Sequence, residues 1–349
     1  MIGQAAPWLR EIEVFTSEAE GFYRFVIPSL VIAKDGTILA FCEGRKYGPG
    51  DYEAGYLLLK RSADNGVTWK QLQQVAGNTD NPFHNPTAVV DQDTGTIWLA
   101  FGQEAFQTFV IHSNDSGATW SEPLEITKDV TAPDWVHHVV GPGSGIQTRS
   151  GRLILTGDHI DNTRYDSVFS RSHVIYSDDH GANWKLGGRL DRGTNECEVV
   201  ETSDGSLYMT SRSADRSKHH RISSWSRDGG DTWSEPVYVE ELPDPICQAS
   251  IRRYTDATIH DRDRILFANP ASETRDHLTV RISYDECKTW AVSKVLYVGP
   301  SAYSDMAIAP DMSICCLYDR GATAAYESIQ LAQFNLEWLS DGKDYIGRG

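Results

Sequence analysis

The chain has 349 residues, of which 40% are apolar, and a formal net charge of -17 at pH 7. An acidic chain lacks the basic face that nucleic acids and anionic membranes require, so we expect neither as a partner. No run of 18 apolar residues occurs, and the sequence predicts no transmembrane helix. The first residues contain no basic segment followed by an apolar one, so we expect no signal peptide and a cytoplasmic location. The six cysteines form no Cys-x-x-Cys pair, which favours buried thiols and suits a reducing compartment.

An eight-residue motif, Ser-x-Asp-x-Gly-x-Thr-Trp, recurs five times along the chain, with Asn183 replacing Thr in one copy and Cys287 replacing Gly in another. Aspartate and serine side chains can bond nearby backbone amides, and glycine permits a positive φ, so each copy is typical of a hairpin turn. We call these copies the box motifs and expect them to be structural. They are Ser62–Trp69, Ser113–Trp120, Ser177–Trp184, Ser226–Trp233 and Ser283–Trp290.

A second series of segments alternates with the box motifs, and each member is a polar turn followed by a strand with alternating, β-branched residues. The six members are Ala33–Phe41, Asp91–Phe101, Thr148–Gly157, Thr202–Ser211, His260–Ala268 and Ala309–Tyr318. A repeat of about 50 residues is typical of a propeller with one four-stranded blade per repeat. The sequence therefore predicts an all-β fold, a six-bladed β-propeller forming one domain over residues 1–349. Because there are only five boxes, we expect the last blade to be closed by Arg10–Phe15 and Ser328–Leu339, from the two chain ends.

Ligands of such a ring bind at one mouth of the central channel, so charged residues beside the inner strands are the candidates for a site. Alone, each of them is typical of a solvated loop. Their possible convergence from four blades is what suggests function. They are Glu43, Arg45, Asp51, Glu196, Arg212, Arg275 and Tyr303.

Six short stretches, in chain order, carry a resemblance to a known family: "FVIP", "AFCEGRK" followed by Asp51, "NECEVVE", "TSR", "NPASETR" and "AYSD". Over about Glu20 to Leu317 the chain resembles bacterial sialidases (neuraminidases) of the Asp-box, six-bladed kind. The resemblance implies a retaining exo-glycosidase that removes a terminal sialic acid, or a related 2-keto sugar acid, from a glycoconjugate. We expect no cofactor and no metal.

The same resemblance implies a role for each matching residue. Tyr303 would be the nucleophile, Glu196 its base and Asp51 the general acid/base. Arg212 and Arg275 would bind the substrate carboxylate, and Arg45 would contact the sugar. A sialoside carries a carboxylate on its anomeric carbon, which would repel an anionic nucleophile, whereas a neutral tyrosine deprotonated by a glutamate avoids that repulsion.

One departure from the family pattern concerns substrate binding. Val26, in "YRFVIPSL", stands where the family has its first carboxylate-binding arginine. Arg24 lies two residues earlier on the same strand face, displaced by roughly 6–7 Å, and is the substitute candidate. Asp319, in "LYDRG", replaces the glutamate that usually orients the missing arginine, so the two changes are linked.

Three alternatives stay open from sequence. The pairs His137–His138 and His219–His220 could supply a histidine base, although paired loop histidines are more often polar surface. An alkaline-earth ion held by loop carboxylates has no motif behind it, and the spacing does not fit zinc. The site could also be retargeted to another acidic or neutral sugar, or serve only to bind carbohydrate. The sequence does not determine the oligomeric state.

Overall fold

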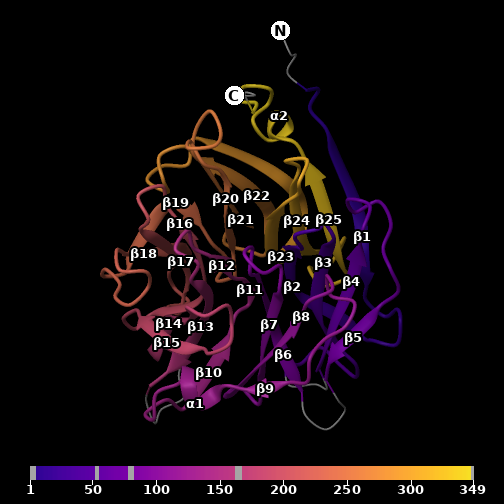
Figure 1. The fold of residues 1–349 in the computed structure, drawn as a ribbon. Helices are drawn as coiled ribbons and strands as arrows, with labels where there is room; N and C mark the ends of the chain where they lie inside the picture. Colours follow the sequence, from indigo (N-terminus) through magenta and orange to yellow (C-terminus); the bar gives the residue numbers. More distant parts are fainter. Residues whose placement is uncertain (1–4, 52–54, 78–81, 162–166, 347–349) are drawn as a thin grey trace.

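A computed structural model describes residues 5–51, 55–77, 82–161 and 167–346. The described chain folds almost entirely into antiparallel β-sheets, which are arranged around a common centre (Figure 1). The helical elements within it are short: α1 (Thr127–Val130), the 3-10 turn η1 (Ser167–Phe169) and α2 (Leu336–Leu339). The predicted all-β class is confirmed.

The first two sheets are built from the N-terminal part of the chain. One contains, in spatial order, β2 (Arg24–Ile32), β3 (Ile38–Arg45), β4 (Gly55–Ser62) and β5 (Gln73–Ala76). The next contains β11 (Gly143–Ser144), β6 (Phe83–Val90), β7 (Ile97–Gln103), β8 (Gln107–Ser113) and β9 (Leu124–Glu125).

Two further sheets follow. One contains β10 (His137–Val140), β13 (Leu153–Ile160), β14 (Ser170–Ser177) and β15 (Lys185–Arg189), with β12 (Ile146–Gln147) paired to β13. The other contains β16 (Thr194–Glu201), β17 (Leu207–Ser213), β18 (His220–Ser226) and β19 (Val237–Pro243).

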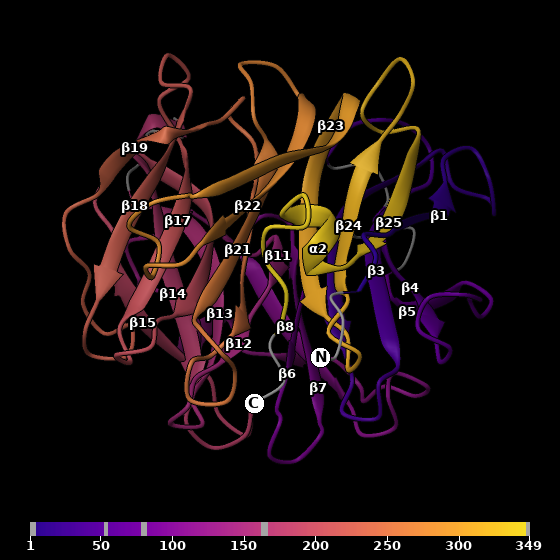
Figure 2. The same cartoon turned by 90° about the horizontal axis from the view of Figure 1, so that it is seen from above.

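The last sheet has seven strands and includes both ends of the chain. Its order is β1 (Leu9–Thr16), β25 (Ser328–Phe334), β24 (Ile314–Arg320), β23 (Val292–Ile308), β22 (Asp276–Ser283), β21 (Arg264–Pro270) and β20 (Ser250–Thr255). The 17-residue strand β23 belongs to two four-stranded units, one on each side of it. Counting these units separately gives six blades, which we keep as an interpretation. Seen from above, β23 joins the orange and yellow parts of the ring (Figure 2).

The ring closes where the first strand pairs with the last. β1 lies antiparallel to β25, with Leu9 opposite Phe334 and Thr16 opposite Ser328, as the indigo and yellow strands of Figure 1 show. β1 and β25 fall on the two segments that the sequence predicts as closing strands. The expectation of a strand as far as Leu339 is wrong, because Asn335 accepts a hydrogen bond from the backbone N–H of Trp338 and caps the helix α2.

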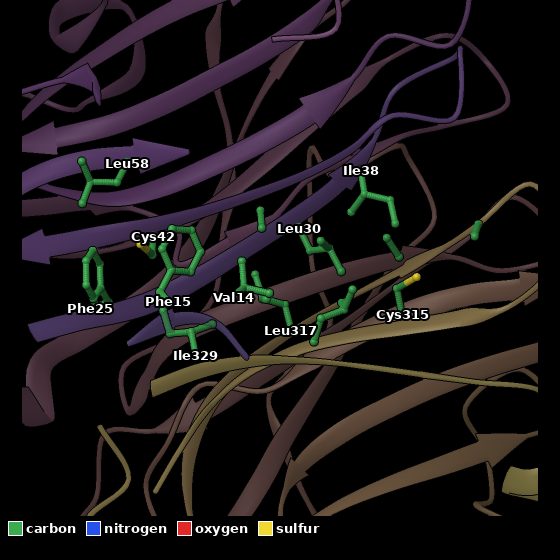
Figure 3. Packing of buried hydrophobic residues seen from close by; sticks show 14 of the residues in the cluster. Val14, Phe15, Phe25, Leu30, Ile38, Cys42, Leu58, Cys315, Leu317 and Ile329 are labelled. Atoms are coloured by element: carbon green, nitrogen blue, oxygen red, sulfur yellow. The ribbon is translucent and has the colours of Figure 1, made fainter. Parts of the chain in front are cut away.

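Buried apolar side chains pack behind this closure. Val14 and Phe15 of β1 pack with Leu30 of β2, Leu317 of β24 and Ile329 of β25 (Figure 3). Each of these side chains is at most 4% exposed. Burial of an apolar side chain of this size is worth about 1.5–3 kcal/mol, so the contact offsets the entropy of joining the two ends.

The box motifs are the turns that the sequence predicts. In the first, Asp64 Oδ1 accepts the backbone N–H of Thr68 at 2.8 Å and the Ser62 hydroxyl at 2.8 Å. Gly66 takes a φ of 79° and donates its N–H to Ser62 Oγ. The same bonds recur at Asp115, Asp179, Asp228 and Asp285. Each box tryptophan packs against a buried apolar cluster; they are Trp69, Trp120, Trp184, Trp233 and Trp290.

A buried polar network joins the sheets across the centre. Arg252 of β20 donates to Asp305 Oδ1 of β23 at 3.0 Å and to the carbonyl oxygen of Gly145 at 3.1 Å. Asp305 Oδ2 accepts the N–H of Leu30 in β2 at 2.7 Å. Glu198 of β16 lies 3.8 Å from the same guanidinium, and burial together with the charge of Asp305 raises the pKa of Glu198 well above its usual range. One cation therefore serves two carboxyl groups that are fully buried.

We predict that Arg252→Met lowers the free energy of unfolding by about 3–5 kcal/mol, because it leaves a buried carboxylate without its counter-charge. The measurement is urea unfolding followed by far-UV circular dichroism. Arg253→Met, at the next residue, is the matched control. Arg253 pairs with Glu286 and Asp263, whose side chains are 18% and 20% exposed and can be hydrated. Equal losses in the two variants would contradict the importance that we give to the central network.

Candidate active site

A cavity of about 330 Å³ opens at one mouth of the ring, between strands of different sheets. Seven of the eight residues that the sequence predicts for the site line this cavity, and the eighth, Glu43, lines an adjoining cavity. Five further residues complete the lining. The selected residues are Arg24, Arg45, Asp51, Glu196, Arg212, Arg275 and Tyr303. The others are Val26, Ile27, Pro49, Asp319 and Tyr326.

Three of these side chains form a hydrogen-bonded cluster. The Tyr303 hydroxyl donates to Glu196 Oε1. Arg212 Nη1 donates to Glu196 Oε2 at 2.7 Å and to the Tyr303 hydroxyl oxygen at 3.1 Å. The three residues come from β23, β16 and β17, and the Glu196 and Arg212 side chains are only 13% and 16% exposed.

The electrostatics of the cluster keep the phenol neutral. Burial, and then the negative charge of Glu196, raise the pKa of Tyr303 well above its usual range, although Arg212 and Arg275 act in the opposite direction. A phenol in this state becomes a nucleophile only if a base takes its proton as it reacts. Glu196 already accepts that proton in a hydrogen bond.

Irregularities in the strands present these side chains to the mouth. The register of β16 with β17 shifts between Thr194 and Cys197, and that of β23 with β24 shifts between Ser301 and Ser304. Glu196 and Tyr303 therefore lie in bulges, which re-aim a side chain out of the regular alternation. The register of β2 shifts in the same way between Val26 and Ser29.

The bulge of β2 also carries backbone strain. Ile27, which lines the cavity, has a φ of 59°. A β-branched residue in this region costs of order 1–3 kcal/mol and persists only where the surroundings impose it. Strain of this kind is frequent at functional sites, and here it lies at the mouth where the candidate residues meet.

Asn195, the residue before Glu196, is hydrogen-bonded to a buried carboxyl group. Asp158 Oδ2 accepts Asn195 Nδ2 at 2.8 Å and the Ser170 hydroxyl at 2.9 Å. Burial and the charge of Glu196 raise the pKa of Asp158 to about 7. These buried bonds fix the backbone from which Glu196 projects, and the sequence analysis missed them because their partners lie far apart in the chain.

Arg275 and Arg24 lie beside tyrosine rings that line the same cavity. The Arg275 guanidinium lies 5.4 Å from the centre of the Tyr303 ring and donates to the Tyr326 hydroxyl. The Arg24 guanidinium lies 5.1 Å from the centre of the Tyr326 ring. Tyr326 was not predicted, because it stands in a loop between β24 and β25 with no motif around it.

Arg45 and Asp51 stand at the entrance. Arg45 Nε is 2.7 Å from Glu43 Oε1, and Arg45 Nη1 is 2.9 Å from Asp51 Oδ1. The Asp51 side chain is 82% exposed, so a substrate can reach it. These residues also line an adjoining cavity of about 150 Å³, to which His84 and Asn85 contribute.

The histidine pairs do not line either cavity in the described part of the chain. His138 is buried and shares a hydrogen bond of 2.7 Å with the Thr108 hydroxyl, and His220 lies 3.6 Å from Glu240. The alternative of a histidine base at this site is therefore not supported. Among the described residues, Asp91, Asp93 and His180 lie close enough together to hold a cation. They also lie outside both cavities.

The arrangement combines a neutral nucleophile with its base, an exposed carboxyl group at the entrance, and several arginines around one cavity. Planar arginine forks match a carboxylate well, so an anionic substrate fits the cavity. Within the described residues, no helix combines the length and apolar character that crossing a membrane would require.

Comparison with known proteins agrees with this geometry. A family model for the BNR repeat-like domain matches residues 58–316. A sialidase from Micromonospora viridifaciens is 35% identical over 95% of this chain, which spans 55% of the length of that relative. An exo-alpha-sialidase from Aspergillus fumigatus is 29% identical, over 97% of this chain and 93% of its own length.

Among solved structures, the Hadza microbial sialidase Hz136 superposes with a TM-score of 0.85 at 27% identity, over 94% of this chain and 69% of that one. Such sialidases are β-propellers, in agreement with the sheet arrangement found here. Because the family match covers well over half of the chain, this protein belongs to the BNR repeat-like family, in which the relatives named above are sialidases.

Proposed function

We propose that the protein is an exo-glycosidase of the sialidase type, which hydrolyses a terminal sialic acid or a related 2-keto sugar acid from a glycoconjugate with retention of configuration. The observation that carries the proposal is the hydrogen-bonded cluster of Tyr303, Glu196 and Arg212 inside a cavity bordered by arginines. A protein that only bound carbohydrate would have no use for a nucleophile already bonded to its base.

In the first step, the Tyr303 oxygen forms a bond to the anomeric carbon while the glycosidic C–O bond breaks. The phenol proton moves to Glu196 along their hydrogen bond. Asp51 gives a proton to the leaving oxygen, so the aglycone departs as an alcohol. Arg212, which contacts both Tyr303 and Glu196, stabilises the negative charge that is shared between them during the transfer.

In the second step, Asp51 takes a proton from water, and the resulting hydroxide attacks the anomeric carbon. The bond to Tyr303 breaks, and the phenolate recovers its proton from Glu196. Two displacements at the same carbon leave its configuration unchanged. The exposure of Asp51 suits this role, because both the leaving group and the incoming water approach from the entrance.

The substrate carboxylate would be bound by Arg212 and Arg275, with Arg24 beside them. Val26 offers no charge at the position of a third, family-type arginine. A charge-assisted hydrogen bond is worth about 1.5–3 kcal/mol, so its absence lowers affinity or rate on ordinary sialosides by roughly ten- to a hundredfold. We therefore propose that the preferred substrate carries its carboxylate in a different position from that of common sialosides.

The test of the proposed function is a screen with aryl glycosides of sialic acid, other ulosonic acids and neutral sugars, with NMR detection of the anomer first released. We expect release from at least one ulosonic acid glycoside, with retained configuration. Activity on neutral sugars alone, or on none of the substrates, would contradict the proposal.

We predict that Tyr303→Phe and Glu196→Gln each lower kcat by at least about a hundred- to ten-thousandfold, the range that removal of proton transfer typically costs. The two losses should not add in the double variant, because the residues act as a unit. Tyr326→Phe is the matched control: it loses a hydroxyl that bonds Arg275 but no reacting group, so its kcat should fall far less. Turnover near that of the native enzyme in Tyr303→Phe would rule out a tyrosine nucleophile.

We further predict that Val26→Arg raises kcat/KM on aryl sialosides by roughly ten- to a hundredfold, since it restores one charge-assisted bond. The new side chain would enter the cavity beside Asp319, which can accept its N–H. Val26→Met, which adds length without charge, should give no gain. If the native enzyme already cleaves sialosides as fast as Val26→Arg does, Arg24 or another group fills the place of the missing arginine.

A further inference from the structure

Asp319 is a buried carboxyl group with little to stabilise a charge. It lies in β24, is 0% exposed and lines the large cavity. Its Oδ2 accepts the backbone N–H of Tyr303 at 3.2 Å. In the part of the chain that the structure describes, Oδ1 has no hydrogen-bond partner, and Asp319 forms no ion pair.

The charged groups that face Asp319 are three arginines from other elements: Arg24 of β2, Arg45 of β3 and Arg275, which precedes β22. Each is engaged elsewhere. Arg45 pairs with Glu43 and Asp51, Arg275 donates to the Tyr326 hydroxyl, and Arg24 stacks on the Tyr326 ring. The titratable neutral groups around it are Cys42, Tyr303 and Tyr326.

Burial outweighs the field of these arginines. An unpaired carboxylate removed from water is costly enough that the group takes up a proton instead. In agreement with this, burial raises the pKa of Asp319 well above its usual range, although the Tyr303 N–H and the three arginines act against it. An anionic substrate in the cavity would add a further negative charge and favour the protonated acid still more.

We infer that Asp319 carries a proton in the folded protein, holds the Tyr303 backbone through its carbonyl oxygen, and thereby keeps negative charge out of the cavity that receives the substrate. Asp319 is then a positioning residue: it touches the bulge that presents the nucleophile and acts on the reaction through it. Only the clause about the substrate rests on the proposed function. The proton on Asp319 does not depend on it.

The sign of the pH effect on stability follows from this state. If Asp319 is protonated when folded and ionised when unfolded, the folded chain binds one more proton, and stability falls as pH rises from the unfolded pKa near 3.9 toward the folded value. Asp319→Asn imitates the neutral acid and does not titrate. Its Tm relative to the native chain should therefore rise with pH, by about 2 °C for each pH unit between about pH 5 and pH 8.

Asp344→Asn is the matched control. Asp344 is also buried, but it pairs with Arg264 through both oxygens, at 2.7 and 2.8 Å, and these contacts lower its pKa despite burial. Its loss should lower Tm by an amount that stays constant over the same pH range. If the Tm difference of Asp319→Asn is flat or falls with pH, Asp319 is ionised and the inference is overturned.

Two measurements complete the test. Should Asp319→Asn fail to fold, NMR of native protein labelled at the aspartate carboxyl carbons decides the point. A protonated resonance near neutral pH that disappears in Asp319→Glu is expected, and its absence overturns the inference. The effect of Asp319 on the substrate is tested by KM. For an aryl sialoside, KM of the native enzyme should rise as Asp319 ionises at alkaline pH, whereas KM of Asp319→Asn should not. If no sialoside is cleaved, the proposed function fails while the Tm series still decides the proton.

Discussion

The contacts between the sheets depend on one cation that is mostly removed from water. Arg252 donates to Asp305 within its own sheet and to the hydroxyl of Ser144 in β11, and it lies beside Glu198 of β16, so one guanidinium links strands of three sheets. Asp305 reaches a fourth sheet by accepting the backbone N–H of Leu30 in β2. Apolar side chains of different sheets also pack together, as Leu30 of β2 and Leu317 of β24 do, and the inner strands approach one another closely. Gly143 illustrates the crowding: a Cβ there would lie 2.1 Å from Glu198 Oε1.

The same network supports the strands that carry Tyr303 and Glu196. Gln248 donates to Glu198 Oε1 at 3.2 Å and accepts the N–H of Ser304 at 3.0 Å, one residue after Tyr303. Asn195, which is one residue before Glu196, donates a hydrogen bond to Asp158. The bulges that carry the two residues are thus anchored at their ends, while their middles project into the mouth. A hydrogen bond between Tyr303 and Glu196 requires that neither strand can slide, and these buried bonds resist sliding.

Short sequence patterns predicted those features whose stabilising contacts join residues close together in the chain. A box turn is closed by bonds between residues two to four apart, such as Ser62, Asp64 and Thr68, so its motif contains the whole structure. The closing of the last blade by the two chain ends was predicted because the chain has six hairpin segments but only five box motifs. Predicting a strand through Leu339 failed because a cap at Asn335 overrides an apolar pattern that fits a strand as well as a helix.

Features made between distant residues were not predictable from one sequence. The positive φ of Ile27 and the bulges of β16 and β23 depend on which strands lie alongside, and Tyr326 acquires meaning only through Arg275 and Arg24. The candidate residues were selected through a resemblance, and their gathering in one cavity gives that selection a geometric basis.

The charge around the cavity differs in sign from the net charge of the whole chain. The net charge of -17 repels an anion at long range, but salt screens such repulsion beyond about 8 Å at physiological ionic strength. Within that distance Arg24, Arg212 and Arg275 line the cavity, and the guanidinium groups of Arg24 and Arg275 lie over the rings of Tyr326 and Tyr303. A charge at Asp319 would oppose these arginines at the shortest range, where no salt intervenes. In the proposed reaction, a tyrosine in place of a carboxylate nucleophile and a proton on Asp319 would answer the same requirement, because each removes a negative charge that would repel the substrate carboxylate.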